Sequence, residues 1–258
     1  MKVSLHIVEA RRAQLASILA SEGYLPLADV CSRLGVSEAT ARRDLSALAD
    51  KNAITRTHGG ALVEYNQRFP SFRERLADAD DAKRRIAAAA RRLITSGMTI
   101  WCDGGTTVYR LAEQLADDPV SGLVVVTNSL PVAEMLADRE DCEVHLLGGR
   151  FFRRSSLLIG GHAAENVAAW RFDRAFLGAE GLDAKGAWNS QADMTALQRL
   201  VAERSDKTVL LADASKLGCR APEFLAGWST FDRVLTDAKP GQLKTHCITL
   251  APGRLIAA

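Results

Sequence analysis

The sequence predicts an α/β protein with a mostly parallel sheet, preceded by a small domain of three helices and a β-hairpin. Residues 9–50 have the periodicity of amphipathic helices, whereas beyond residue 82 apolar runs of strand length alternate with helix-like stretches. Strands that alternate with helices are typical of βαβ units. A polar stretch that contains Pro70 separates the two parts. The expected domains are therefore residues 1–63 and 82–258, joined by a linker at 64–81.

Apolar residues recur at helical spacing along the first part of the chain. They are Leu15, Ile18 and Leu19 in a first expected helix and Leu27, Val30, Cys31 and Leu34 in a second. The second helix is expected to end at Gly35, and Ser37 is a favourable N-cap for a third. The third helix would bury Ala41, Leu45 and Leu48. Alternating residues around Gly59 and Gly60 then predict a β-hairpin over residues 54–63.

The polar face of the third helix carries side chains suited to reading DNA. Two helices joined by a tight turn fit a helix-turn-helix, whose second helix enters the major groove. Arginine donates two hydrogen bonds to a guanine edge, and the hairpin would form a wing against the phosphate backbone. The candidate DNA-binding residues are Ser37, Glu38, Thr40, Arg42, Arg43, Ser46, Arg56 and His58. The alternative is a solvated helix face, because exposed charges are the default on a surface helix.

The larger part contains six apolar runs and four helix-like stretches. The expected strands are 98–102, 123–127, 142–147, 175–177, 208–212 and 233–236, and the expected helices are 82–95, 108–116, 131–137 and 192–204. In a Rossmann-like parallel sheet the loops after these strands lie along one edge, where ligands bind.

Several of these strands are followed by glycine-rich or polar residues. The segment Asp103–Thr107 joins a strand to a helix, and a glycine-rich turn there offers free N–H groups and the positive end of the helix dipole to a phosphate. Each turn alone is more often an ordinary turn, but five at one edge favour a polar-ligand cleft, with Lys216 and Arg150 as its cations. The candidate effector-binding residues are Asp103, Gly104, Gly105, Thr106, Thr107, Asn128, Ser129, Gly149, Arg150, Gly178, Glu180 and Lys216.

Composition narrows the class of protein. Up to Arg75 there are 11 Lys and Arg against 8 Asp and Glu, and 22 against 23 beyond it, so the small positive excess lies at the front. Five scattered cysteines give neither a disulfide framework nor a zinc site. No apolar run is long enough to span a bilayer, and no signal core precedes the first helix. We expect a cytoplasmic protein without metal, cofactor or membrane partner.

Two motifs resemble those of the DeoR family of repressors. They are Leu34-Gly35-Val36-Ser37-Glu38-Ala39-Thr40-Ala41-Arg42-Arg43-Asp44-Leu45 and Arg56-Thr57-His58-Gly59-Gly60-Ala61. Residues 75–250 resemble that family's effector domain, itself similar to the ribose-5-phosphate isomerase fold. The resemblance implies operator binding as a dimer or tetramer, and a phosphorylated sugar or related metabolite that weakens this binding.

The same resemblance bears on catalysis. Gly104–Thr107 matches the phosphate loop of the isomerase, and Ser205–Lys207 together with Ala212–Lys216 matches a late isomerase segment. By this alignment the isomerase's glutamate falls at Gln198, and its two aspartates fall at Leu177 and Glu180. Glutamine cannot abstract a proton, so the resemblance implies no catalytic residues. Two alternatives remain: an active sugar-phosphate isomerase with a DNA-binding appendage, and a DNA-binding protein that ignores small molecules.

Overall fold

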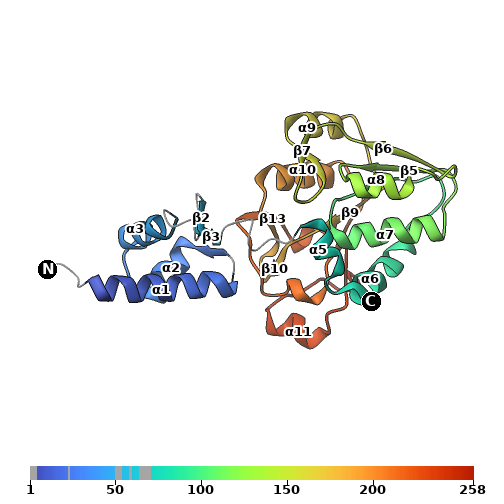
Figure 1. Ribbon diagram of the computed structural model, residues 1–258. Coiled ribbons are helices and arrows are strands. Elements are labelled where there is room, and N and C mark those ends of the chain that lie inside the picture. Colours follow the sequence, from blue (N-terminus) through green and yellow to red (C-terminus); the bar gives the residue numbers. More distant parts are fainter. Residues whose placement is uncertain (1–4, 23, 50–53, 58–59, 64–70) are drawn as a thin grey trace. The chain divides into compact units, whose positions relative to one another are not determined.

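The computed structural model describes residues 5–22, 24–49, 54–57, 60–63 and 71–258 (Figure 1). The chain divides into two compact units. The smaller unit is Met1–Pro70 with Arg220–Pro222, and the larger unit is Ser71–Cys219 with Glu223–Ala258.

The smaller unit contains three helices and a three-stranded antiparallel sheet. Its elements are α1 (Leu5–Glu22), β1 (Tyr24–Pro26), α2 (Leu27–Leu34), α3 (Glu38–Ala49), β2 (Ile54–Thr57) and β3 (Gly60–Val63). Strand β3 lies between β1 and β2, and Thr57 pairs with Gly60 across the hairpin. The three helices and the hairpin predicted from the sequence are thus confirmed, whereas the first strand was not predicted.

The helices of the smaller unit share one apolar core. Its buried members are Leu15, Leu19, Leu25, Val30, Ala41, Leu45 and Leu48. Gly35 ends α2 with a φ of 62°, a left-handed conformation that glycine adopts without a steric penalty. The tight turn into α3 therefore depends on this residue.

The larger unit is built on a seven-stranded sheet in the order β15-β14-β12-β9-β4-β5-β6, and all six neighbouring pairs are parallel. Its strands are β4 (Thr99–Cys102), β5 (Leu123–Thr127), β6 (Cys142–Leu146), β9 (Arg174–Gly178), β12 (Thr208–Leu211), β14 (Arg233–Thr236) and β15 (Leu255–Ala257). The expected α/β fold with a parallel sheet is confirmed.

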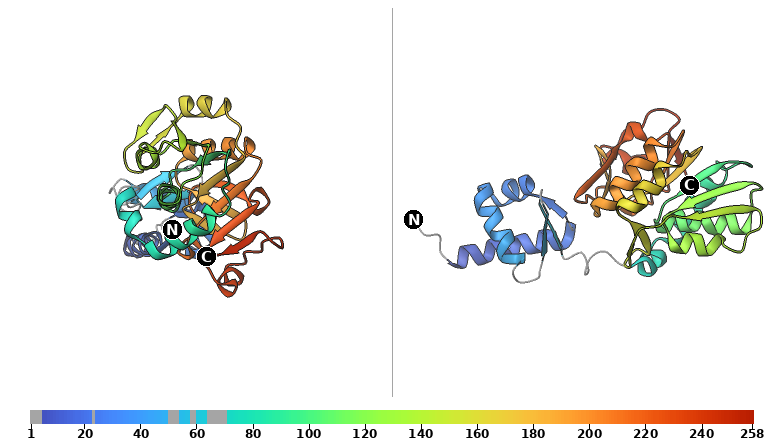
Figure 2. Two further views of the ribbon diagram at one scale, coloured as in Figure 1. Left: turned by 90° about the vertical axis from the view of Figure 1, so that its right-hand side faces the viewer. Right: turned by 90° about the horizontal axis from the view of Figure 1, so that it is seen from above.

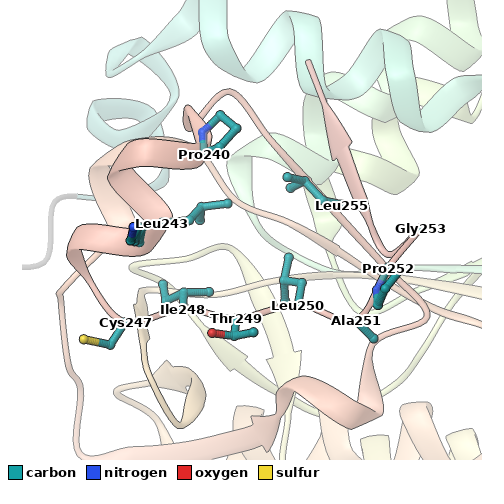
Figure 3. A pocket seen from close by; sticks show the side chains of 11 residues that line it. Pro240, Leu243, Cys247, Ile248, Thr249, Leu250, Ala251, Pro252, Gly253 and Leu255 are labelled. Atoms are coloured by element: carbon teal, nitrogen blue, oxygen red, sulfur yellow. The ribbon is translucent and has the colours of Figure 1, made fainter.

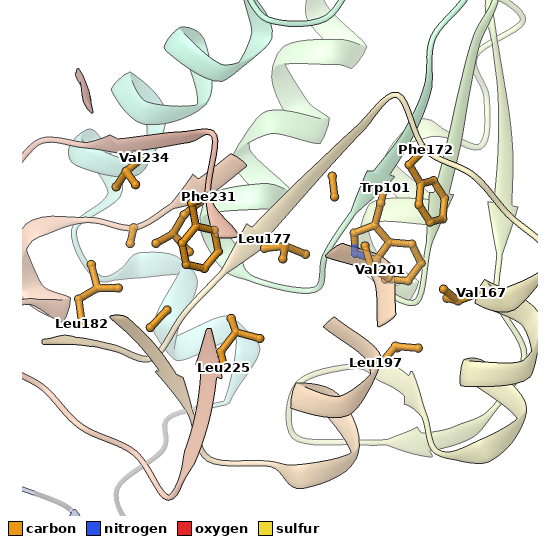
Figure 4. Packing of buried hydrophobic residues seen from close by; sticks show 14 of the residues in the cluster. Trp101, Val167, Phe172, Leu177, Leu182, Leu197, Val201, Leu225, Phe231 and Val234 are labelled. Carbon is orange, nitrogen blue, oxygen red and sulfur yellow. The ribbon is translucent and has the colours of Figure 1, made fainter. Parts of the chain in front are cut away.

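Helices cover both faces of this sheet, as Figures 1 and 2 show. Side chains of α6 (Asp80–Arg91), α7 (Thr106–Asp117) and α8 (Leu130–Leu136) pack with Ile100 and Cys102 on one face. Those of α9 (Gly161–Ala168), α10 (Ala192–Glu203) and α11 (Pro240–Thr245) belong to the cluster around Trp101 on the other face (Figure 4). Because successive side chains of a strand point to opposite faces, both faces of these strands are apolar.

Smaller elements complete the larger unit. They are α5 (Phe72–Ala77), the hairpin strands β7 (Arg150–Phe152) and β8 (Leu157–Ile159), the antiparallel strands β10 (Gly181–Asp183), β11 (Gly186–Asn189) and β13 (Glu223–Gly227), and the 3₁₀ turns η1 (Ala214–Lys216) and η2 (Trp228–Thr230). Residues 72–77 and 80–81, expected in a linker, are therefore helical. Residues 64–70 of that linker lie outside the described residues.

Candidate functional site

Helix α3 begins as its cap predicts. The backbone N–H of Thr40 donates to Ser37 Oγ at 3.4 Å, and the hydroxyl groups of Ser37 and Thr40 are 3.0 Å apart. The helix buries Ala41, Leu45 and Leu48, as expected, together with Asp44. Ser37 and Thr40 therefore mark the helix start, which in a helix-turn-helix is the end that contacts base edges.

The exposed face of α3 carries two arginines that differ in their ion-pair partners. Arg42 donates to Glu38 Oε1 from Nε at 3.0 Å and from Nη2 at 2.5 Å. Arg43 is exposed and has no ion-pair partner within the described part of the chain. The Ser46 hydroxyl donates to the carbonyl of Arg42 at 2.8 Å. Arg43 is thus the arginine that is free to contact an anion.

Asp44 fixes α3 against α1. Its carboxylate accepts hydrogen bonds from Arg11 Nε at 2.6 Å and from Arg12 Nε at 2.8 Å. Burial would raise the pKa of Asp44, but the hydrogen bonds from the two guanidinium groups outweigh it and lower the pKa. The orientation of α3 therefore depends on an ion-pair cluster as well as on apolar packing.

Two predicted DNA contacts belong to the hairpin. Arg56 is part of β2, where its backbone pairs with Ala61 of β3. Its side chain, like the whole of His58, lies outside the described residues.

In the larger unit, residues at or just after the ends of four neighbouring strands lie along the same edge of the sheet. Cys102 pairs with Thr127 and Phe176, and Leu211 pairs with Gly178, so the strand ends are in register. The residues at this edge are Asp103 and Gly104, Asn128 and Ser129, Gly178, and Asp213. Parallel strands thus bring together segments that are far apart in the sequence.

The first of these segments leads directly into a helix. Gly105 is the N-cap of α7, and Thr106 and Thr107 form its first turn with 6% of their surface exposed. The first N–H groups of a helix have no intrahelical partner, so this turn offers donors and a partial positive charge to an anion.

Gly104 has a specific steric requirement. A Cβ atom built on it would lie 1.9 Å from Cδ2 of Leu157, a buried residue of β8. The β7–β8 hairpin therefore contacts the glycine loop closely at this position, and only glycine fits there without displacing Leu157.

Asp103 is 2% exposed and belongs to a buried network. Its Oδ2 accepts hydrogen bonds from the Gly178 N–H at 3.0 Å and from Gln198 Nε2 at 2.7 Å. Asn189 Nδ2 donates to Gln198 Oε1 at 2.6 Å and so orients the Gln198 amide. Burial raises the pKa of Asp103, against the opposing effect of the backbone N–H groups of Gly178 and Gly104 and of the Gln198 amide. Its Oδ1 is buried and has no partner among the described residues, so it can accept a hydrogen bond.

Other predicted residues have structural partners. The Asn128 amide donates to the Leu158 carbonyl at 3.1 Å, and Ser129 Oγ accepts from the N–H of Val132, which caps α8. Gly149 has a φ of 157°, and a Cβ there would lie 3.0 Å from the Ile159 carbonyl oxygen. Arg150 is largely exposed and pairs with Asp193 on α10 at 2.8 Å. These residues shape the edge of the sheet or its hairpin.

Charged groups gather on the side of η1. Lys216 is half-buried at the end of η1, and Asp213 caps η1 through the Ser215 N–H at 3.0 Å. Burial raises the pKa of Glu180, and the Ser190 hydroxyl and the charges of Arg75 and Lys216 oppose this effect. Glu180, Arg75 and Lys216 therefore influence one another electrostatically.

Sequence reasoning missed Arg75, Lys83 and Asn189. The first two lie on α5 and α6, in or beside the segment expected to be a linker, and the third is the last residue of a short strand that was not predicted. Nothing in the sequence indicated the burial of Lys83, which stands among Asp81, Arg84 and Arg85 and is nevertheless 3% exposed.

A separate groove of about 620 Å³ lies between α11 and β15 (Figure 3). Apolar side chains such as Leu243, Ile248 and Leu250 form most of its lining, and Lys244 is its charged member. It contains none of the predicted site residues. Within the described ranges no His, Cys, Asp and Glu side chains cluster as in a metal site, and no helix has the length and apolarity to cross a membrane.

Two family models match the chain. Residues 11–67 match the DeoR-like helix-turn-helix domain, and residues 78–238 match the DeoR C terminal sensor domain. The HTH-type transcriptional repressor GlcR of Bacillus subtilis is 31% identical and covers 91% of this chain and 90% of its own length. The Glycerol-3-phosphate regulon repressor of Escherichia coli is 32% identical, with coverage of 89% and 91%. The HTH-type transcriptional regulator UlaR of Escherichia coli is 29% identical, with coverage of 89% and 91%.

Similar solved structures are more distant. Ribose 5 phosphate isomerase A from Neisseria gonorrhoeae has a TM-score of 0.40 at 21% identity and covers 53% of each chain. Translation initiation factor eIF-2B from Pyrococcus horikoshii has a TM-score of 0.43 at 14% identity and covers 90% of this chain and 89% of its own.

Proposed function

The chain belongs to the DeoR family of transcriptional regulators, and from this premise we propose that it is a repressor that releases its operator when its larger unit binds a phosphorylated sugar or related metabolite. It is a DNA-binding regulator with a sensor domain, and its relatives include the transcriptional repressor GlcR and the Glycerol-3-phosphate regulon repressor. The DNA contacts that we propose come from the start and exposed face of α3 and from the hairpin that follows it.

One observation carries the proposal for the effector: a glycine loop at the start of α7 adjoins a buried carboxylate oxygen that lacks a partner among the described residues. The loop offers backbone N–H donors to a phosphate group. Asp103 is an acceptor when ionised and would repel a phosphate, so we assign its Oδ1 to a hydroxyl group of the ligand. A molecule with both a phosphate and hydroxyl groups satisfies both requirements. One relative's name, which refers to glycerol 3-phosphate, agrees with this chemical class.

The positive charge that faces this anion is assigned to Lys216. A lysine is a compact, mobile charge that suits phosphate without requiring a fixed geometry. Thr106 and Thr107 add hydroxyl donors in the first turn of α7. Arg150, which pairs with Asp193, contributes less to this proposal than the sequence suggested.

Calorimetry tests the effector class. The probes are ribose 5-phosphate, glucose 6-phosphate and glycerol 3-phosphate, each compared with its unphosphorylated parent. Thr106→Ala should weaken binding of the phosphorylated probe by about 1 kcal/mol, because one hydrogen bond is lost. Lys216→Ala should weaken this binding more. Neither variant should change operator affinity without ligand, so both would be repressors that no longer respond. Equal binding of phosphorylated and neutral probes would show that the loop does not recognise phosphate.

We also propose that the chain has no sugar-phosphate isomerase activity. The Gln198 amide donates to Asp103 and to the Gly178 carbonyl, so it acts as a donor where isomerisation needs a base. Purified protein should therefore not interconvert ribose 5-phosphate and ribulose 5-phosphate above a mock preparation. Turnover that Lys216→Ala abolishes would instead establish the isomerase alternative.

The assembly and the compartment complete the proposal. We propose a homo-oligomer, a dimer or tetramer, that acts in the cytoplasm on double-stranded operator DNA. Two-fold assemblies of helix-turn-helix proteins bind paired half-sites. Analytical ultracentrifugation would show the oligomeric state, and a monomer at all concentrations would contradict it.

A further inference from the structure

Helix α5 is fastened to both sides of the glycine loop. On one side, the N–H of Phe72 donates to the Arg154 carbonyl in the β7–β8 turn at 2.9 Å. On the other side, the Phe72 ring packs edge-on against Tyr109 of α7, with ring centroids 5.4 Å apart. Figure 1 shows α5 beside the start of α7. A movement of the β7–β8 turn or of α7 would therefore displace α5.

Arg75 extends from α5 toward the effector site. Its Nη2 donates to Ser155 Oγ at 3.1 Å, and its Nε is buried without a partner among the described residues. Its positive charge acts on both Asp103 and Glu180 and opposes the rise in their pKa values that burial causes. No carboxylate of the described chain forms an ion pair with it. The guanidinium group thus keeps an unused donor, Nε, and is close enough to Asp103 and Glu180 to affect the charge of both.

Lys83 anchors the end of the same helix. The side chain is 3% exposed, and Nζ donates to the backbone carbonyls of Arg75 and Asp78. Burial lowers the pKa of Lys83, while the nearby charge of Asp213 opposes this effect. Lys83 therefore links α6 to the last turn of α5 beside the loop that carries Lys216.

We propose that Arg75 is a ligand of the effector's phosphate group and that this contact transmits occupancy of the site to the segment leading to the DNA-binding unit. The inference rests on the proposed function, because it requires an anionic effector at the glycine loop. Guanidinium groups bind phosphate through two parallel hydrogen bonds, and Arg75 has a buried donor to spare.

The chain order explains why this contact would matter for regulation. Only residues 64–70 separate β3 of the hairpin from the capped start of α5. A ligand shifts a conformational equilibrium only through contacts that differ between the two states. A bond from the effector to Arg75 would be such a contact, since Arg75 would exchange the neutral Ser155 hydroxyl for a charged partner.

The test compares Arg75→Gln and Arg75→Lys with Arg73→Gln, an exposed arginine of the same helix, in the full-length chain. The probes are ribose 5-phosphate, glucose 6-phosphate, glycerol 3-phosphate and their neutral parents. Arg75→Gln should lower the affinity for the phosphorylated probe at least about tenfold, the usual effect of a lost charge-assisted hydrogen bond. Arg75→Lys should recover part of it. Binding of the unphosphorylated probe to Arg75→Gln should stay unchanged. A merely structural role of Arg75 would instead weaken binding of the phosphorylated and the unphosphorylated probe alike.

A second measurement tests transmission. An operator selected in vitro from random DNA should bind the parent and Arg75→Gln equally without ligand. With the site saturated, the parent and Arg73→Gln should release it and Arg75→Gln should not. If Arg75→Gln binds the phosphorylated probe like the parent, the inference fails and the proposed function stands. If it binds weakly but still releases DNA at saturation, Arg75 does not transmit occupancy. If the parent binds no phosphorylated probe, both the proposed function and the inference fail.

Discussion

Gln198 Nε2 donates a 2.7 Å hydrogen bond to Asp103 Oδ2, across 95 positions of the sequence. The contact joins the middle of α10 to the strand end that begins the glycine loop. It directs one carboxylate oxygen toward the protein and leaves the other, Oδ1, as an acceptor. Gln198 thus positions a carboxylate group that suits hydroxyl recognition.

Replacing Asp103 with asparagine should increase stability and weaken ligand binding. The carbonyl oxygen of the introduced amide can accept the two bonds that Oδ2 receives, and the substitution removes a buried charge. At pH 8 we expect the free energy of unfolding to rise by about 1–2 kcal/mol, the usual cost of an incompletely satisfied buried group. Burial raises the pKa of Asp103 in the folded protein. The protonated Asp103 carboxyl group therefore contributes to the stability of the parent protein at low pH, and this contribution is lost as the pH rises through the folded-state pKa.

The advantage of Asp103→Asn should therefore shrink as the pH falls from 8. Urea unfolding monitored by tryptophan fluorescence measures it, since all four tryptophans lie in the larger unit. Asp193→Asn, an exposed carboxylate of α10, is the control. An advantage that grows toward acid pH would contradict the assigned direction of the shift.

Replacing Gly104 with alanine should displace Leu157. The added Cβ would lie 1.9 Å from Leu157 Cδ2, and overpacking of this kind costs about 1–3 kcal/mol. Gly148→Ala is the matched control, because no atom lies within 4 Å of a Cβ there. Combining Gly104→Ala with Leu157→Ala should cost less than the sum of the two single changes, since the second removes the clash. Additive effects in urea unfolding would show that the two residues do not compete for space.

Sequence patterns predicted the parallel sheet well because its strands are buried on both faces and so read as uninterrupted apolar runs. The same topology predicted that Asp103, Asn128 and Gly178 would meet at one edge. Residues 72–77 and the hairpin of β7 and β8 were missed, since their few residues show no period that separates them from loops.

The contacts that refine the site could not be predicted for a different reason. The contact of Gln198 with Asp103, and that of Leu157 with Gly104, join elements distant in the sequence. They depend on how α10 and the hairpin pack on the sheet, which periodicity does not encode. Arg75 was assigned to the linker for the same reason, and Lys83, within the expected helix 82–95, stands among charged neighbours.

Removing the Asp44 carboxylate should destabilise the smaller unit. Asp44→Ala leaves the guanidinium groups of Arg11 and Arg12 without their partner, and breaking a buried ion pair this way costs about 3–5 kcal/mol. Amide hydrogen exchange of α1 and α3 in the full-length chain measures the loss. Glu9→Ala, an exposed change on α1, is the control and should leave exchange unchanged.

The direction of the Asp44 pKa shift determines how the stability of this ion-pair cluster depends on pH. The hydrogen bonds from Arg11 and Arg12 lower the pKa of Asp44, so its contribution is present above the unfolded value of about 3.9 and is lost as the pH falls through the folded value. The stability difference between the parent and Asp44→Asn should therefore narrow in acid. A difference that stays constant between pH 6 and pH 3 would rule out ionic stabilisation.

Arg42 and Arg43 should differ in their effect on DNA binding. Arg43 is exposed and unpaired within the described residues, so Arg43→Ala should weaken binding to an operator selected in vitro by about 1–3 kcal/mol if it reads a base. Arg42 must first leave Glu38, to which it donates at 3.0 and 2.5 Å, so Arg42→Ala should cost less. Glu38→Ala frees Arg42 and removes a carboxylate, and it should increase affinity for random DNA.

If the arginines contact phosphate rather than a base, their replacement should lower the affinity for operator and random DNA alike and flatten the salt dependence of binding. Fluorescence anisotropy at several salt concentrations measures both effects. Should both folded arginine variants bind the operator like the parent, α3 is not the recognition helix.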